Sequence, residues 1–279
     1  MSSRRRAIAG LAILVIAVSA AATASPAAAA KSPGARAHVS IVGGGPANPT
    51  DWPFVVTLYR KNRLHCGASL IAPNKVLTAA HCVEGFNLSK FAVIVGRPDL
   101  KNTGTGVSIA VAAGATHPDF AETGMHDMAV LTLAQATTTT PVTLATQTEN
   151  DIFTATGAQL SVAGWGAQNP LGFKLSTFLK TTTEQVRSNR KCVRAYTKDI
   201  FNPVTMICAV GHRIPKFKRP PINSSACSGD SGGPLVANTS AGVRQVGIVS
   251  YGGAFCGLPA APTVYTRVTS GLDFIAANG

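Results

Sequence analysis

The sequence predicts an all-β fold, and three features support this prediction. The apolar residues come in short runs, the runs are rich in valine, isoleucine and threonine, and glycine, proline or asparagine separates them. Short β-branched runs bounded by turn residues are typical of antiparallel strands in a barrel or a sandwich. The runs on which this prediction depends cover residues 54–59, 68–71, 75–80, 91–96, 128–133, 160–166, 246–252 and 263–268.

Helical structure is expected only near the C-terminus, over about residues 271–277. The polar stretch 137–140, followed by Pro141, is the best candidate for a linker between two halves. A chain of 279 residues is long enough to bury a sizeable core, as one large domain or two small ones.

Residues 1–30 have the features of an export signal. Arginines at 4–6 precede an apolar run over 7–22, and small residues then offer cleavage sites after Ala24 or Ala30. A membrane anchor is the alternative, but the run is short, rich in alanine and followed by small residues, which favours removal. No later segment is apolar enough to span a bilayer, so a secreted, extracellular product without membrane contact is expected.

All cysteines follow the predicted signal, and their number is even. In an oxidising compartment this predicts three disulfides, of which fifteen connectivities are open. A zinc site is the alternative, but no CxxC spacing and no HExxH motif is present, so neither a metal nor a cofactor is expected. The cysteines are Cys66, Cys82, Cys192, Cys208, Cys227 and Cys256.

The formal net charge is +13, and from Ile41 onward 20 basic and 12 acidic residues leave +8. A basic balance of this size can favour anionic partners. The charge is nevertheless spread along the chain, without an Arg/Lys-rich helix or an aromatic repeat. A solvated basic surface is therefore the preferred interpretation, and nucleic acid is not an expected partner.

Three separated segments carry groups for nucleophilic catalysis: LTAAHC with His81, HDMAVLTL with Asp127, and CSGDSGGPL with Ser231. A serine hydroxyl is a poor nucleophile until an imidazole takes its proton, and a carboxylate must orient that imidazole. Glycines beside Ser231 let the main chain approach a substrate, and the N–H groups of Gly229 and Ser231 can bind a developing oxyanion. These residue types together predict acyl transfer.

Five motifs occur in order: IVGG at Ile41, TAAHC at His81, DMAVL at Asp127, GDSGGP at Ser231 and SYG at Ser250. Any one of them could arise by chance, but all of them in this order should not. From its first motif to its last residue the chain resembles the trypsin and chymotrypsin family of secreted serine endopeptidases.

The resemblance implies two six-stranded antiparallel β-barrels, over 41–140 and 141–279, with the active site in the cleft between them. His81 and Asp127 would come from the first barrel and Ser231 from the second. It also implies a monomer that hydrolyses proteins or peptides through an acyl-enzyme, with protein inhibitors as further candidate partners.

The same resemblance assigns further roles. Ser250 would hydrogen-bond the catalytic aspartate. Cleavage before Ile41 would remove a propeptide, residues 31–40, and create an α-ammonium group that pairs with Asp230 and orders the oxyanion loop. The implied disulfides are Cys66–Cys82, Cys192–Cys208 and Cys227–Cys256.

The residue before this cleavage site departs from the pattern, because it is Ser40 rather than a basic residue. A trypsin-like activator is therefore not expected. Cleavage near Arg36 followed by trimming, and self-processing after a small residue, both stay open.

Three positions define the expected specificity pocket. Ser225 stands where trypsins carry an aspartate, so a buried Arg or Lys would lack a partner charge. Gly252 leaves the entrance open, and Thr263 should shorten the pocket. We therefore expect a small or medium apolar residue, such as Ala, Val or Leu, before the scissile bond. The alternative is that these residues only pack the loops, which would leave the specificity undetermined.

The stretch between Cys208 and Cys227 holds 18 residues, including HRIPKFKRPP, and is longer than expected for the family. A solvated surface loop is the preferred interpretation over an extension that selects acidic substrates. The family's calcium loop is not evident, since Arg97 follows Gly96 where an acidic ligand would be sought, so no required metal is expected.

Two other classes of function compete with the endopeptidase. A catalytically inactive relative that binds a partner is disfavoured by the intact His81, Asp127 and Ser231. A secreted structural or adhesive β-protein leaves the ordered motifs unexplained. Both predict no reaction with an active-site serine reagent.

Overall fold

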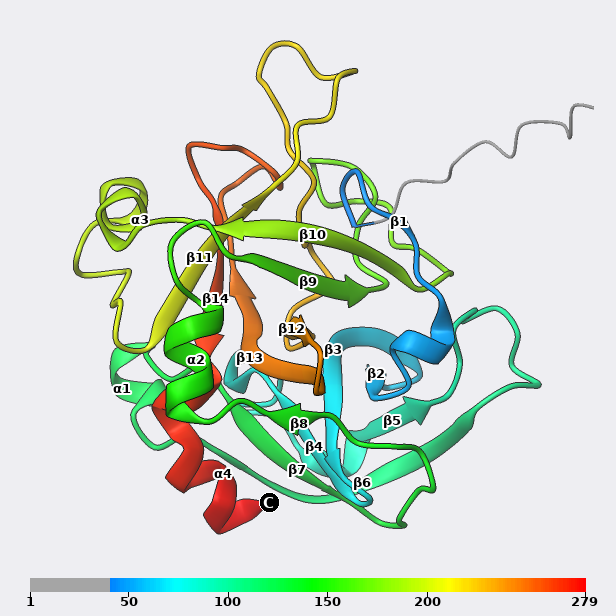
Figure 1. Cartoon of the computed structure of the whole chain (residues 1–279). Helices are drawn as coiled ribbons and strands as arrows, with labels where there is room; N and C mark the ends of the chain where they lie inside the picture. Colours follow the sequence, from blue (N-terminus) through cyan, green and yellow to red (C-terminus); the bar gives the residue numbers. More distant parts are fainter. Residues whose placement is uncertain (1–40) are drawn as a thin grey trace, which may run out of the picture. The chain divides into compact units, whose positions relative to one another are not determined.

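The computed structural model describes residues 41–279, which form mostly antiparallel strands (Figure 1). The predicted signal peptide and propeptide lie outside the described residues. Within residues 41–279, no helix is both long and apolar enough to cross a membrane.

Six strands close the first barrel, in the order β2-β3-β4-β7-β6-β5. Closure is made by β2 and β5, where Leu58 lies opposite Val93. Inward side chains such as Leu70, Leu77 and Leu131 are fully buried, as alternation along half-buried strands requires. The strands are β2 (Val55–Arg60), β3 (Arg63–Ala72), β4 (Lys75–Thr78), β5 (Phe91–Val95), β6 (Val107–Thr116) and β7 (Ala129–Leu133).

Six further strands close the second barrel, in the order β10-β11-β14-β13-β12-β9. Strand β9 completes the ring because it pairs with both β12 and β10. Two short strands extend this sheet: β1 (Gly45–Pro46) pairs with β10, and β8 (Thr143–Leu144) pairs with β13. The barrel strands are β9 (Gln159–Gly164), β10 (Lys180–Val186), β11 (Met206–Gly211), β12 (Pro234–Thr239), β13 (Gly242–Tyr251) and β14 (Thr263–Arg267). The predicted fold of two six-stranded barrels is confirmed.

Helices occur at more places than the sequence predicted. The expected C-terminal helix is present as α4 (Leu272–Asn278), but the prediction of helical structure only there is wrong. The other α-helices are α1 (Phe120–Thr123), α2 (Gln147–Phe153) and α3 (Asn189–Tyr196). Single 3₁₀ turns are η1 (Pro49–Asp51), η2 (Ala80–Cys82), η3 (Leu88–Lys90) and η4 (Val268–Gly271).

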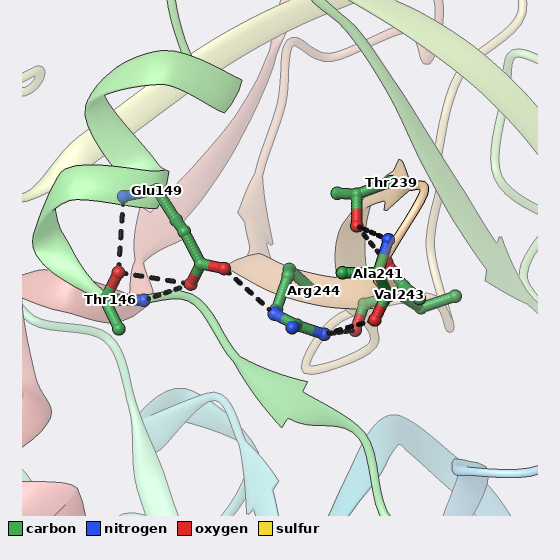
Figure 2. Close-up of polar contacts among 7 residues, drawn as sticks. Thr146, Glu149, Thr239, Ala241, Val243 and Arg244 are labelled. Atoms are coloured by element: carbon green, nitrogen blue, oxygen red, sulfur yellow. Dashed lines mark hydrogen bonds and ion pairs between the residues drawn. The ribbon is translucent and has the colours of Figure 1, made fainter.

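Helix α2, which lies between β8 and β9 in the sequence, begins with a capping box that explains why it forms there. The Thr146 hydroxyl accepts a hydrogen bond from the Glu149 amide at 3.3 Å, and the Glu149 carboxylate accepts one from the Thr146 amide at 3.0 Å. Glu149 Oε1 also accepts a hydrogen bond from Arg244 Nε of β13 at 3.1 Å (Figure 2). The Thr-x-x-Glu spacing was a readable signal for this helix.

Several hydrogen bonds join the two barrels, including the following. The Gly67 amide of β3 donates to the Ser231 carbonyl at 2.8 Å. The buried Ser69 hydroxyl donates to Gln245 Oε1 of β13 at 2.7 Å. Helix α4 also returns to the first barrel, where Lys75 Nζ donates to the Asn278 carbonyl at 2.7 Å. The first of these contacts holds the loop that carries Ser231 against the first barrel.

Candidate active site

The imidazole of His81 and the carboxylate of Asp127 form one hydrogen-bonded unit. His81 lies in the turn η2 just after β4, and Asp127 lies two residues before β7, the strand that pairs with β4. His81 Nδ1 is 2.7 Å from Asp127 Oδ2, and the His81 amide donates to Asp127 Oδ1 at 2.9 Å. Asp127 therefore binds both the main chain and the imidazole of His81, which fixes the orientation of the ring.

Asp127 is held by a third donor from the other barrel. The Ser250 hydroxyl at the end of β13 donates to Asp127 Oδ2 at 2.6 Å. Burial alone would raise the pKa of Asp127, but the hydrogen bonds from His81 and Ser250 outweigh it and hold this pKa below its usual value. The side chain is 4% exposed and ionised at neutral pH.

The loop with Ser231 is a tight turn pressed against the first barrel. The Asp230 amide donates to the Cys227 carbonyl, and the Gly233 amide donates to the Asp230 carbonyl, both at 2.9 Å. Gly232 has a φ of +82°, and a Cβ there would collide with Thr78 of β4. The glycine after Ser231 is therefore needed for both its backbone conformation and this close approach.

Two main-chain amides in this loop are available to a ligand. Within residues 41–279, the N–H groups of Gly229 and Ser231 donate no hydrogen bond, whereas the Asp230 and Gly232 amides around them do. Gly229 has a φ of +95°, which few other residues adopt. Free amides beside a serine hydroxyl are what an oxyanion site requires.

The carboxylate of Asp230 points away from Ser231, into the second barrel. Its Oδ1 accepts from the Gly166 amide at 2.7 Å and its Oδ2 from the Cys227 amide at 2.9 Å. A Cβ at Gly164 or Gly166 would collide with this carboxylate. Burial raises the pKa of Asp230 to about 7 against these two bonds.

Ile41 is fully buried in the core of the second barrel. Next to it, Val42 accepts a hydrogen bond from the Ser225 amide at 2.9 Å. The start of the IVGG motif therefore reaches the wall of the pocket described next.

A pocket of about 210 Å³ opens beside Ser231. It is lined by all three predicted specificity residues, Ser225, Gly252 and Thr263, together with Ser250. Ser225 Oγ and Thr263 Oγ1 lie 2.9 Å apart and are both buried, so the two hydroxyl groups are hydrogen-bonded to each other. A Cβ at Gly252 would meet no heavy atom within 4 Å, which leaves that side open.

Glu184 on β10 lies behind this pocket, and sequence reasoning missed it. It is completely buried, and its Oε1 accepts a hydrogen bond from the Ala226 amide at 3.1 Å. Lys180, Thr182, Glu184 and Val186 all lie on the buried face of β10, but the polar sequence KTTTEQV gives no apolar alternation that would have shown this. Burial, with the neighbouring Asp230 adding to it, raises the pKa of Glu184 to about 8.

Replacement of Glu184 by glutamine is expected to remove a loss of stability that wild type undergoes as the pH rises from about 5 to about 8. Because the pKa of Glu184 is about 8 when folded and near 4.5 otherwise, the folded state binds the extra proton between these values. Wild-type stability therefore falls as pH rises through this window, and Glu184→Gln removes this loss. The unfolding free energy of the variant relative to wild type should rise by about 2–4 kcal/mol from pH 5 to pH 8.

Urea unfolding at each pH measures this difference, with Glu84→Gln, at an exposed site, as the matched control. Parallel pH curves for wild type and Glu184→Gln would contradict the prediction.

The three disulfides pair as the resemblance implies. Cys66–Cys82 joins β3 to the His81 turn, Cys192–Cys208 joins α3 to β11, and Cys227–Cys256 joins the Ser231 loop to the pocket rim. No free cysteine occurs in the described part of the chain. Two of the three crosslinks thus brace the segments that carry the candidate site.

An Asp–His unit beside a serine, with free amides and a side-chain pocket, defines a serine-type endopeptidase. Comparison with known proteins agrees, since the family model described as Trypsin matches residues 41–275. The chain belongs to the trypsin family.

Similar proteins include "Trypsin" of Saccharopolyspora erythraea, 33% identical, which covers 84% of this chain and 96% of that protein. "Venom protease" of Bombus pensylvanicus is 35% identical over the same shares of the two chains. "Kallikrein-11" of Homo sapiens is 30% identical, covering 84% of this chain and 79% of that protein.

Proposed function

We propose that the protein is a secreted endopeptidase that is made as a precursor and cleaves after small or medium apolar residues. The observation that carries the catalytic proposal is the hydrogen-bonded His81–Asp127–Ser250 array beside the pocket that Ser231 lines. Ser231 is the nucleophile, His81 the general base and Asp127 the group that orients it.

In this mechanism the Ser231 hydroxyl attacks the substrate carbonyl, and its proton passes to His81 Nε2. Asp127 holds Nδ1–H of the ring and stabilises the imidazolium that forms. The carbonyl oxygen becomes an oxyanion, which accepts hydrogen bonds from the Gly229 and Ser231 amides. The imidazolium then protonates the leaving amine, and a water molecule repeats the sequence on the acyl-enzyme.

Labelling with a fluorophosphonate probe tests the catalytic proposal. The protein starting at Ile41 should be labelled, and the Ser231→Ala variant should not be. If folded protein with a confirmed Ile41 N-terminus stays unlabelled, the partner-binding alternative replaces the enzyme.

For activation, we propose that residues 1–30 are an export signal and 31–40 a propeptide, removed by cleavage before Ile41. The burial of Ile41 and of the Asp230 carboxylate supports this. Within residues 41–279 no basic group forms an ion pair with Asp230, so a new ammonium at Ile41 would supply its counter-charge, and this ion pair would keep the oxyanion loop ordered.

We also propose residues 41–140 and 141–279 as the two domains, because each range contains six barrel strands. The expected partners are protein or peptide substrates and protein inhibitors, and a monomer in the extracellular space is the proposed form. The relative named as a venom protease supports this proposal of function outside the cell.

Replacement of Ser225 by aspartate is expected to switch the preference towards Arg and Lys. Wild type offers only hydroxyl groups, from Ser225 and Thr263, at this wall of the pocket. A carboxylate there would pair with a basic side chain in a desolvated site, and the ratio of kcat/KM for Arg over Leu should rise by about 100-fold.

Peptide substrates that differ only in the residue before the scissile bond measure this ratio. Ser225→Asn is the matched control, since it has the same shape without the charge. Equal ratios for the two variants, or a sharp wild-type preference for Arg or Lys, would refute the proposed specificity.

A further inference from the structure

Three side chains around helix α1 converge on one point outside the active site. Asp119 directly precedes α1 and makes no side-chain capping bond there, His117 lies just after β6, and His126 lies just before Asp127. Asp119 Oδ2 is 3.3 Å from His126 Nδ1 and 3.9 Å from His117 Nδ1. The two imidazole rings stack with their centroids 4.2 Å apart and their planes 10° apart. One carboxylate oxygen thus faces two ring nitrogens.

The ring nitrogens Nδ1 of His126 and His117 have few hydrogen bonds within residues 41–279. His126 Nδ1 is buried and has no hydrogen-bond partner among residues 41–279. His117 Nδ1 accepts only a long bond of 3.3 Å, from the Asp119 amide. The Asp119 side chain is 54% exposed, so the cluster is open to solvent on one side. An unpartnered buried nitrogen aimed at an accessible carboxylate needs a further explanation.

The spacing fits a small divalent ion. Tetrahedral zinc with ligands at 2.0–2.1 Å places its ligand atoms about 3.4 Å from one another. The Asp119–His126 separation of 3.3 Å already matches, and the Asp119–His117 separation of 3.9 Å needs to close by about 0.5 Å. Two imidazoles and one carboxylate leave the fourth position to water.

We propose that His117, Asp119 and His126 form a binding site for a divalent transition-metal ion, for which Zn²⁺ is the best fit. The only other group of suitable ligand types in residues 41–279 is Cys66, His81 and Cys82, whose sulfur atoms are consumed by a disulfide. The sequence led us to expect no metal, and this proposal departs from that expectation; the site would be regulatory and not required for catalysis.

The position of the cluster couples it to the active site. The His117 amide donates to the Met128 carbonyl at 3.0 Å, and the Met128 amide donates to the His126 carbonyl at 2.6 Å. Asp127 therefore lies between His126 and Met128, and the main chain of Met128 is hydrogen-bonded to both His117 and His126. Both rings must leave their parallel stack to face one ion, and the movement at His126 passes to Asp127 next to it. Metal binding should lower kcat reversibly.

The binding test uses Ser231→Ala protein, which cannot digest itself, in equilibrium dialysis against Zn²⁺ and in absorption titration with Co²⁺. One ion per chain and the strong visible bands of tetrahedral Co²⁺ are expected. Asp119→Asn and His126→Asn should each weaken binding at least about 10-fold. Asparagine is chosen at 126 because His126 has a φ of +51°, which asparagine tolerates.

The control is His81→Ala, which removes the catalytic imidazole and should leave metal binding unchanged. Absence of binding, binding that Asp119→Asn and His126→Asn leave intact, or binding that His81→Ala abolishes would overturn the site. In active protein, Zn²⁺ should lower kcat in wild type but not in Asp119→Asn. Binding at the cluster without a change in kcat would overturn the coupling to Asp127. The binding result does not depend on the protein being a protease.

Discussion

Replacing Ser231 by alanine is expected to lower kcat by about 10⁶-fold, and combining it with His81→Ala should cost almost nothing more. The two residues act as one unit, because the imidazole has no proton to accept once the hydroxyl is gone. The Gly229 and Ser231 amides survive both changes, since they belong to the main chain. A residual acceleration of about 10³-fold over the uncatalysed reaction should therefore remain.

Single-turnover hydrolysis of a peptide ester by the two single variants and the double variant measures this non-additivity. Circular dichroism and thermal unfolding serve as the control for folding. If the loss of kcat in the double variant equals the product of the losses in the two single variants, Ser231 and His81 act independently, which contradicts the proposed mechanism.

The Asp127→Asn variant should retain the fold but lose about 10⁴-fold in kcat. Three donors face the two carboxylate oxygens: the His81 amide, His81 Nδ1–H and the Ser250 hydroxyl. An asparagine NH₂ group must therefore face at least one of these donors. The His81 ring avoids this conflict by carrying its proton on Nε2 instead of Nδ1. Nε2 can then no longer accept the proton of Ser231.

Ser250→Ala separates this effect from the simple loss of a hydrogen bond. It removes one donor to a charged group, worth about 1.5–3 kcal/mol, and should lower kcat by about 10- to 100-fold. Steady-state kinetics with one apolar peptide substrate compares the two variants. Similar losses for Asp127→Asn and Ser250→Ala would argue against a tautomer switch.

Strands with apolar, β-branched sequences were predictable from the sequence alone. Strand β10 was not among them, because KTTTEQV is polar and its inward face becomes visible only once it pairs with β9 and β11. The small residues of β6 likewise form a strand through pairing with β5 and β7. Where partners supply the stability, local propensity is a weak guide.

The proposed catalytic residues could be named from the sequence because the proposed chemistry demands these residue types, and short motifs mark them. Glu184 carried no motif, since its importance comes from the Ala226 amide that reaches it across the barrel. The cluster of His117, Asp119 and His126 depends in the same way on a loop that turns back through α1. Contacts made by tertiary structure between ordinary residues leave little trace in a single sequence.

The return of helix α4 to the first barrel sets an order for the assembly of the chain. Phe274 lies 5.1 Å from the His117 ring, and the Asn278 carbonyl is bound by Lys75. During synthesis the first barrel emerges early, yet it lacks these contacts until residues 272–278 have been made. The half of the enzyme that is translated first therefore makes these contacts only after helix α4 has been synthesised, so its packing depends on a segment that is translated much later.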